Sequence, residues 1–437
     1  MGGAPGTVVR CDISDLLLVE LSVSVAFFFE RELDVDALAA ALAGALGRIP
    51  AFGGRLRRRD GVLEVVCDDS GVPLTVYDVD ETTAEAIGRM TLTQSGFVEH
   101  VDPKAAQLGE QAPLAVQVSR LADGGTVLGC SWAHAVGDMR SFMTLMHTWS
   151  ALAEGAPPPE AVVVEDRGAY IDGVLPDEDS GRPGFRIIDR EEMALLDQAF
   201  AAAPRANRAV QIYFGGPEVA RMKEHFTAAA QRRLSTNDVL TAHLVTCVRR
   251  LDEDAQVRAL TIPVDLRRFL DLPLGAVGNL VGEIHLESPA DAAAEDLAAR
   301  IRAGVDNFAG AHLSLRTSRR LLAQRGPALL DECVALGFDP PNRTFMLSNW
   351  SGFGVYDTVF EGCRPTAFTP AIGQPLPWVA WVVEGFEGSG FLCTLVVPAA
   401  LAGRLRGAAG ARLLHGFREP GDAQGFPPLA GRIRKLA

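Results

Sequence analysis

The sequence predicts an α+β fold of two domains, each built on a mixed β-sheet flanked by helices. Its 437 residues exceed what one ordinary hydrophobic core accommodates. The predicted strands and helices follow one another without a regular strand–helix–strand repeat, which favours α+β over a doubly wound parallel sheet. Residues 155–205 are irregular and rich in Pro, Asp and Glu, as expected of a crossover between domains. We therefore expect an N-terminal domain over 1–185, a linker over 186–205 and a C-terminal domain over 206–437.

The elements of the first half follow from hydrophobic periodicity. Residues 15–30 are rich in branched and aromatic side chains and predict a strand. Apolar residues at helical spacing predict helices over 35–46 and 139–152, the second directly after Asp138. Shorter strands are expected at 62–67, 74–77, 113–120 and 126–133, with a helix at about 82–91.

The second half shows the same mixture of signals. A strand at 208–214 precedes a helix at 216–229, and a further helix begins where Ser235 or Thr236 can cap it. Other helices are expected at 190–203, 289–309 and 317–335 and from Ala399 onward, and other strands near 258–264, 280–287, 344–348, 378–385 and 391–397.

Charge, cysteines and hydropathy exclude several classes of protein. The formal net charge of -14 argues against a nucleic-acid binder, which needs a basic face. The seven cysteines form no CxxC pair and the histidines show no metal-ligand spacing, so we expect reduced thiols and no metal. Neither a signal peptide nor an apolar run of membrane-spanning length is visible. We expect a cytoplasmic protein without a nucleic-acid or membrane partner.

The segment His134-Ala135-Val136-Gly137-Asp138 lies between a predicted strand and a predicted helix. An imidazole of near-neutral pKa can take a proton from an alcohol and return it to a leaving thiolate, so His134 suits acyl transfer. A histidine at a strand end is also commonly a packed or solvent-facing residue. Asp138, directly before a helix, is also a natural N-cap. These five residues alone leave the catalytic and the structural interpretation open.

Further segments accompany this motif in order. Ser141, Phe142 and Trp149 follow it on the predicted helix, and five other stretches match a known pattern: 46–56, 71–75, 234–243, 263–268 with Gly278-Asn279, and 348–350 with Tyr356-Asp357. In these features the chain resembles the BAHD acyltransferases, which belong with chloramphenicol acetyltransferase and the condensation domains of peptide synthetases. Met139 departs from the family's usual Gly, and residues 359–363 retain little of its DFGWG motif.

The resemblance implies a fold, a reaction and roles for particular residues. The fold would be two similar chloramphenicol acetyltransferase-like domains with an active-site tunnel at their interface, in a monomer. An acyl group would pass from the co-substrate acyl-CoA directly to the acceptor, with His134 as the general base. Asp138 would point away from the substrates and pair with Arg267 as structural support of the site. Asn349 and Trp350 would line the tunnel, although Trp350 equally fits the core.

Coenzyme A needs cations for its phosphates, and a helix N-terminus also favours anions. The candidates for binding it are Arg232, Arg233, Ser235 and Thr236. A solvated charge pair is the alternative interpretation of the two arginines. Gly362 stands where plant members of the family carry the Trp of DFGWG, so no oxyanion donor is identified.

The leading functional interpretation is an O-acyltransferase that acts on a specialised metabolite. N-acylation is an alternative, because the same base serves an amine. A carrier-protein thioester donor is another, although Ala133 stands where condensation domains carry a second histidine. From a different class, the chain could be a non-catalytic binding protein that retains the fold. The intact His134 argues against that, and the altered DFGWG segment argues for it.

Overall fold

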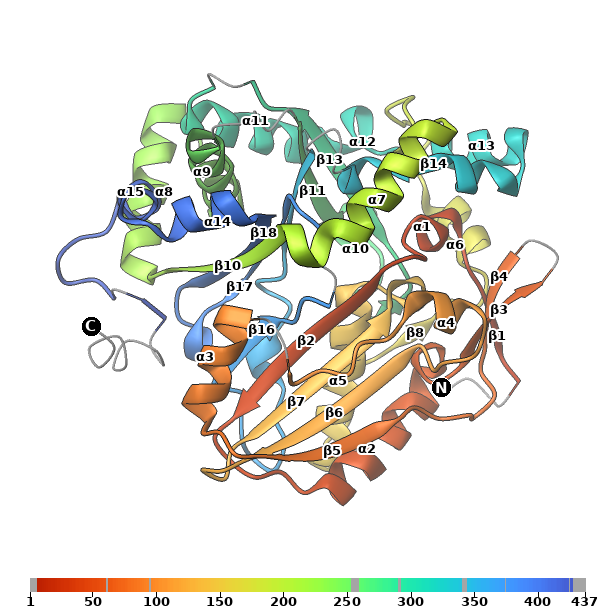
Figure 1. Ribbon diagram of the computed structural model, residues 1–437. Helices are drawn as coiled ribbons and strands as arrows, with labels where there is room; N and C mark the ends of the chain where they lie inside the picture. Colours follow the sequence, from red (N-terminus) through yellow and green to blue (C-terminus); the bar gives the residue numbers. More distant parts are fainter. Residues whose placement is uncertain are drawn as a thin grey trace. The chain divides into compact units, whose positions relative to one another are not determined.

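The computed structural model describes residues 6–59, 62–93, 96–252, 259–289, 292–339, 344–373, 375–423 and 425–426. Residues 258, 290 and 291, which the sequence assigned to a strand and a helix, lie outside the described residues. The chain forms two compact units (Figure 1). Unit 1 comprises the described residues of Met1–Leu175, Asp265–Val281 and Ser351–Gly373, and unit 2 comprises those of Pro176–Val264, Gly282–Trp350 and Gln374–Ala437.

Two segments of the expected C-terminal domain, 265–281 and 351–373, group with unit 1. Strand pairing explains this departure from the contiguous division into 1–185 and 206–437. Strand β16 (Ala367–Pro370) pairs antiparallel with β2 (Ser22–Phe29). Likewise β12 (Ala276–Val277) pairs in parallel with β8 (Val162–Val163). Backbone hydrogen bonds between distant segments, which no local pattern encodes, therefore set the membership of unit 1.

Unit 1 is built on a five-stranded sheet with the strand order β16-β2-β7-β6-β5. Its other strands are β7 (Thr126–Ala133), β6 (Leu114–Leu121) and β5 (Leu74–Val79). The pairs β2–β7 and β6–β7 are antiparallel, whereas β5–β6 is parallel, so the sheet is mixed as predicted. Every residue of β7 is buried, which indicates that both faces of this strand are covered.

Helices α2 (Val35–Arg48) and α5 (Met139–Ala153) pack against each other behind this sheet (Figure 1). The Trp149 indole N–H donates to the Leu38 carbonyl at 2.9 Å and joins the two helices. The rings of Trp132 on β7 and Phe142 on α5 stack with centroids 4.0 Å apart, joining helix to sheet. The apolar stripe predicted over 139–152 therefore faces the core of unit 1.

The predicted strand at 15–30 begins only at Ser22, because Asp12 starts a short helix, α1 (Ile13–Leu16), by a capping box with Asp15. A small sheet has the order β1-β4-β3, from Val8–Arg10, Val62–Val66 and Arg55–Arg59. The remaining elements of unit 1 are α3 (Thr83–Thr93), α4 (Pro103–Gln107), α6 (Arg167–Val174), α10 (Leu266–Phe269) and the 3₁₀ turns η1 (Pro50–Phe52), η2 (His134–Val136) and η6 (Val355–Asp357).

Unit 2 has a six-stranded sheet with the order β10-β18-β17-β15-β11-β13. These strands are Asn207–Phe214, Phe391–Pro398, Val379–Glu384, Thr344–Asn349, Ala259–Asp265 and Val281–Glu287. The pairs β10–β18 and β17–β18 are antiparallel, whereas β15–β17 and β11–β15 are parallel. This second mixed sheet, with its helices, confirms the α+β class.

Helix α9 (Thr236–Leu251) is the most buried helix of unit 2 and contacts α8 (Gly216–Ala230), α11 (Ala294–Asp306) and β15. The helix predicted over 317–335 is wrong in its second half, because Gly326, with φ of +84°, and Pro327 end it. The other elements are α7 (Arg190–Ala206), α12 (Phe308–Ala311), α13 (Leu315–Arg325), α14 (Ala399–Arg406), α15 (Ala408–Leu414), β9 (Phe185–Ile187), β14 (Cys333–Ala335), η3 (Pro327–Glu332), η4 (Leu336–Phe338) and η7 (Phe386–Gly388).

Candidate active site

His134 lies where the buried strand β7 ends and the turn η2 begins. Its backbone N–H donates to the Leu21 carbonyl at 2.9 Å, so the residue is anchored just before β2. The turn needs a small residue at Gly137, because a Cβ there would meet the Ser141 Cβ at 2.8 Å and the Phe52 ring at 3.2 Å. Helix α5 then starts at Met139. Strand β7 and helix α5 therefore fix the backbone on the two sides of the turn that carries His134.

The carboxylate of Asp138 both caps a helix and takes part in a buried ion pair. Its Oδ1 accepts from the Ser141 backbone N–H at 2.8 Å and from the Ser141 hydroxyl at 2.9 Å. Arg267 donates to it at two points, Nη1 to Oδ2 at 2.8 Å and Nη2 to Oδ1 at 3.2 Å. Burial opposes ionisation, but Arg267 and the hydrogen bonds outweigh it and hold the pKa of Asp138 below its usual range. The structure thus brings Asp138 and Arg267 together at the start of α5.

Arg267 donates several buried hydrogen bonds. Its side chain is fully buried, and besides Asp138 it reaches Asp265 Oδ1 at 3.0 Å and the Ala276 carbonyl at 2.7 and 2.9 Å. Burial acts against the charged guanidinium, but the two carboxylates more than compensate and raise the pKa of Arg267. These contacts fasten the segment 265–281 to the start of α5.

The imidazole of His134 contacts Asn279, a residue that the sequence did not mark as part of the site. The His134 Nδ1 lies 3.0 Å from Asn279 Oδ1. The Asn279 amide nitrogen donates to Asp15 Oδ1 and to the His134 carbonyl, both at 2.8 Å. The signal for Asn279 was present in the sequence, since the Gly278-Asn279 pair belongs to a matched stretch, but nothing there assigned it a contact.

These contacts determine which nitrogen of His134 carries the proton. The Asp15 carboxylate and the His134 carbonyl are both acceptors, so the atom of Asn279 that faces them is the donating nitrogen. The amide oxygen therefore faces His134, and Nδ1 must carry the hydrogen in the neutral ring. Burial lowers the pKa of His134, with a hydrogen bond to its own backbone, Asp138, Asn279 and Asp15 acting against it. The imidazole is therefore neutral at neutral pH, with its lone pair on Nε2.

The four residues expected to bind coenzyme A lie together in unit 2, where other contacts already occupy two of them. Arg232 pairs with Asp306 at 2.7 Å. Ser235 is the N-cap of α9, and its hydroxyl accepts from the Asp238 N–H at 3.2 Å. Thr236 is the first residue of α9, and Arg233 is exposed. The Asp238 carboxylate at this helix start pairs with Arg302 at 2.7 Å.

Asn349 and Trp350, expected to line a tunnel, end strand β15 and follow it. The Asn349 amide donates to Asn237 Oδ1 at 2.8 Å. The Trp350 indole N–H donates to the Ser348 hydroxyl at 3.0 Å, and its ring lies 6.2 Å from that of Trp381. Trp350 is buried in unit 2.

The segment that resembles an altered DFGWG motif has a structural use in unit 1. Phe360 is fully buried and packs edge-to-face against Trp149, with ring centroids 5.2 Å apart. Gly362 adopts φ of +71°, a conformation that favours glycine, and its N–H donates to the Glu154 carboxylate at 3.2 Å. These contacts explain a Phe and a Gly at these positions and supply no donor to a reacting group.

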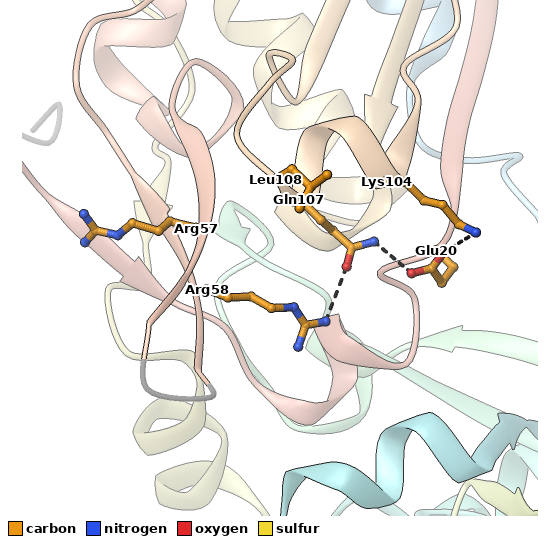
Figure 2. Close-up of a pocket in the computed structure, with 6 residues that line it drawn as sticks. All are labelled: Glu20, Arg57, Arg58, Lys104, Gln107 and Leu108. Carbon is orange, nitrogen blue, oxygen red and sulfur yellow. Dashed lines mark hydrogen bonds and ion pairs between the residues drawn. The ribbon is translucent and has the colours of Figure 1, made fainter.

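A surface pocket of about 420 Å³ lies elsewhere in unit 1 (Figure 2). It is lined by Glu20, Arg57, Arg58, Lys104, Gln107 and Leu108. The Gln107 side chain accepts from Arg58 at 3.3 Å and donates to Glu20 at 3.0 Å. Lys104 lies 3.9 Å from the same Glu20 carboxylate. Mutually paired charges of this kind are typical of a solvated surface, and none of the residues singled out above lines the pocket.

The described residues offer neither a metal-binding cluster nor a helix able to span a membrane. They contain no cluster of three or more His, Cys, Asp and Glu side chains that could hold a metal ion. None of the helices they form combines the length and the apolar character needed to cross a bilayer.

Comparison with known proteins gives consistent matches across most of the chain. The model of the Transferase family matches residues 10–377. Stemmadenine O-acetyltransferase of Catharanthus roseus is 21% identical over 383 residues, covering 81% of this chain and 80% of that protein. Agmatine coumaroyltransferase-1 of Hordeum vulgare is 25% identical over 414 residues, covering 89% and 90%. The F. graminearum TRI101 structure with coenzyme A and deoxynivalenol has a TM-score of 0.75 at 16% identity, covering 93% of this chain and 98% of that one.

Proposed function

Because the chain belongs to the Transferase family, the BAHD acyltransferases, and is an acyltransferase, we propose that it moves an acyl group from acyl-CoA to a hydroxyl of a small specialised metabolite. His134 is the general base in a direct transfer within a ternary complex. One observation carries this proposal: Asn279 holds the Nδ1 side of the ring, and the lone pair of a neutral imidazole is on Nε2. The Asp138–Arg267 pair supports the turn on which His134 stands.

The reaction follows from this geometry in two proton transfers. Nε2 takes the proton of the acceptor hydroxyl while its oxygen bonds to the thioester carbonyl carbon. The tetrahedral intermediate then collapses, the carbon–sulfur bond breaks, and the coenzyme A thiolate receives the proton from Nε2. The ring thus returns to its starting tautomer, with no acyl-enzyme. The lowered pKa of His134 keeps the base neutral at the start of each cycle.

The relatives support the choice of donor and acceptor. One relative is an O-acetyltransferase by name, and one similar structure holds coenzyme A. In this chain we assign coenzyme A contacts to Arg232, Arg233, Ser235 and Thr236, and substrate contacts to Asn349 and Trp350. Arg233 and Thr236 can act without rearrangement, whereas Arg232 would have to share its charge with Asp306.

An amine acceptor is the second candidate. Agmatine coumaroyltransferase-1, whose name states an amine, matches 89% of this chain. The same Nε2 can take a proton from an attacking amine, so the base alone does not distinguish the two acceptors.

Purified protein tests the proposal directly. It is incubated with acetyl-, malonyl- and aromatic acyl-CoAs, with acyl carrier proteins as alternative donors, and with panels of alcohols and amines, while thiol release and acylated product are followed. His134→Ala should lower the transfer rate by about 10²- to 10⁴-fold. The matched control is His225→Ala, an exposed histidine of unit 2 paired with Glu295, which should leave the rate unchanged.

Each possible outcome points to one of the alternative functions. Amine products alone would replace hydroxyl transfer by N-acylation, and transfer from carrier proteins alone would replace coenzyme A. Binding of acyl-CoA without His134-dependent transfer from any donor would leave a non-catalytic binding protein and overturn the enzyme mechanism.

A further inference from the structure

Asp15 is a fully buried carboxylate whose two oxygens accept three hydrogen bonds. Its Oδ1 accepts from Arg167 Nη1 and from the Asn279 amide nitrogen, both at 2.8 Å. Its Oδ2 accepts from the Asp12 backbone N–H at 2.7 Å. Burial raises the pKa of Asp15, but three donors, one of them a guanidinium, require the ionised form, since a carboxyl proton would face another donor.

A neutral amide cannot replace this carboxylate without conflict. An Asn side chain has one acceptor and one donor end, whereas both oxygens of Asp15 face donors. If the oxygen of such an Asn faced the Asp12 N–H, its nitrogen would face the donating end of Asn279. Only the His134 carbonyl would then favour the present orientation of the Asn279 amide, and an amide that turned over would place a nitrogen against the Nδ1–H of His134. The identity of residue 15 is therefore coupled to the orientation of Asn279.

Arg167, the counter-ion of Asp15, reaches the backbone that follows His134. Its Nη1 donates to the Ala135 carbonyl at 2.9 Å and its Nη2 to the Val136 carbonyl at 2.7 Å. Gly278, next to Asn279, lies so close to Arg167 that a Cβ there would meet its Nε at 3.1 Å. The buried pair thus touches both the η2 turn and the residue that contacts the imidazole.

We propose that Asp15 is a positioning residue that sets the Nδ1–H tautomer of His134 through Asn279. The inference rests on the proposed role of His134 as the base, since the tautomer places the reactive lone pair on Nε2. The two steps of the link are the 2.8 Å contact of Asp15 with Asn279 and the 3.0 Å contact of Asn279 with His134. Removing the Asp15 charge alone is costly, because it leaves the buried Arg167 guanidinium without its counter-ion.

The ring nitrogens of His134 report the tautomer without any activity measurement. Protein labelled with ¹⁵N-histidine is studied by long-range proton–nitrogen NMR, and the His134 signals are assigned by their loss in His134→Gln. In the wild type, Nδ1 should be protonated and Nε2 should not. In Asp15→Asn, the two nitrogens should shift toward a mixture of tautomers. Asp12→Asn is the matched control, because it removes a charge from the cap of the same helix without contacting Asn279.

Kinetics provide the second readout. We expect kcat of Asp15→Asn to fall by about 10- to 100-fold, the range found when the outer hydrogen-bond partner of a metal-ligating histidine is removed. The KM should stay within about threefold, because Asp15 touches no substrate. Loss of the negative charge also lowers the pKa of His134 further, so the acid limb of the rate profile should move to lower pH.

The outcomes separate this inference from the proposed function. A wild-type His134 protonated on Nε2, or an unchanged Nδ1–H tautomer in folded Asp15→Asn, overturns the role of Asp15 even if His134→Ala is inactive. A tautomer that shifts as expected while His134→Ala retains full transfer activity confirms the coupling and overturns the base. Should Asp15→Asn not fold, Asp15→Ser, which keeps an acceptor and removes the charge, takes its place with the same expectations.

Discussion

Asp138 and Arg267 form a two-point ion pair across 129 positions of the chain, with neither side chain open to solvent. The same carboxylate caps α5 and accepts the Leu280 N–H at 3.1 Å. One buried group therefore holds the helix start, the segment 265–281 and the turn that carries His134.

Asp138→Ala should lower the free energy of unfolding by about 3–5 kcal/mol, because Arg267 would remain as a buried charge without its partner. The transfer rate should fall as well, since the turn beneath His134 loses its support. Urea unfolding followed by circular dichroism measures the first effect. The control is Asp357→Ala, which breaks an exposed pair with Arg364 and should change stability by at most about 1 kcal/mol. An inactive Asp138→Ala protein that unfolds like the wild type would contradict the structural role.

The pH dependence of that stabilisation has a defined sign. The pKa of Asp138 is lower in the folded protein than in the unfolded chain, where it is about 3.9. Its contribution is therefore complete above that value and is lost as the pH falls through the folded pKa. The difference in free energy of unfolding between wild type and Asp138→Asn should be constant from about pH 5 to pH 7 and shrink below about pH 4. A difference that grows on acidification would refute the depressed pKa.

The rate of acyl transfer should keep its full value at neutral pH and decline only in acid. Burial lowers the pKa of His134 from its ordinary value of 6.5, and the proposed base works in the neutral form. The kcat/KM plotted from about pH 5 to pH 8 should therefore have its half-maximal point below 6.5. Acyl donors that do not hydrolyse in this pH range, and a check that the protein stays folded at each pH, exclude losses of rate unrelated to His134. A half-maximal point above 6.5 would mean that the imidazolium is favoured in the site.

Gly137→Ala should destabilise the protein by about 1–3 kcal/mol, because the added methyl group would press on Ser141 and Phe52 in a packed core. Its backbone is extended, with φ of 170°, so the effect comes from contact and not from backbone strain. Gly173→Ala is the matched control, since a methyl group there meets nothing within 4 Å and lies in helix α6. Thermal unfolding of both variants makes the comparison, and equal stability of Gly137→Ala and wild type would argue against the close approach.

Local patterns in the sequence predicted much of the frame around the site. The strand over 126–133, the helix over 139–152 and the placement of His134 and Asp138 between them follow from side-chain periodicity and capping, which act between near neighbours. Local patterns gave wrong boundaries where two structural tendencies competed. Residues 15–30 are apolar enough for a strand, yet the Asp12 cap begins a helix first, and Gly326 with Pro327 interrupts an apparent helix.

By itself, the sequence determined the α+β class, the motif with His134 and Asp138, and the resemblance that indicates an acyltransferase. Only the tertiary structure decided what contacts the imidazole. Asn279 lies 145 positions from His134, and Asp15 lies 264 positions from Asn279. No periodicity relates residues so far apart, because their meeting depends on strand pairing and on buried hydrogen bonds between remote segments. The proton on His134 is therefore set by groups that the chain brings together only when it folds.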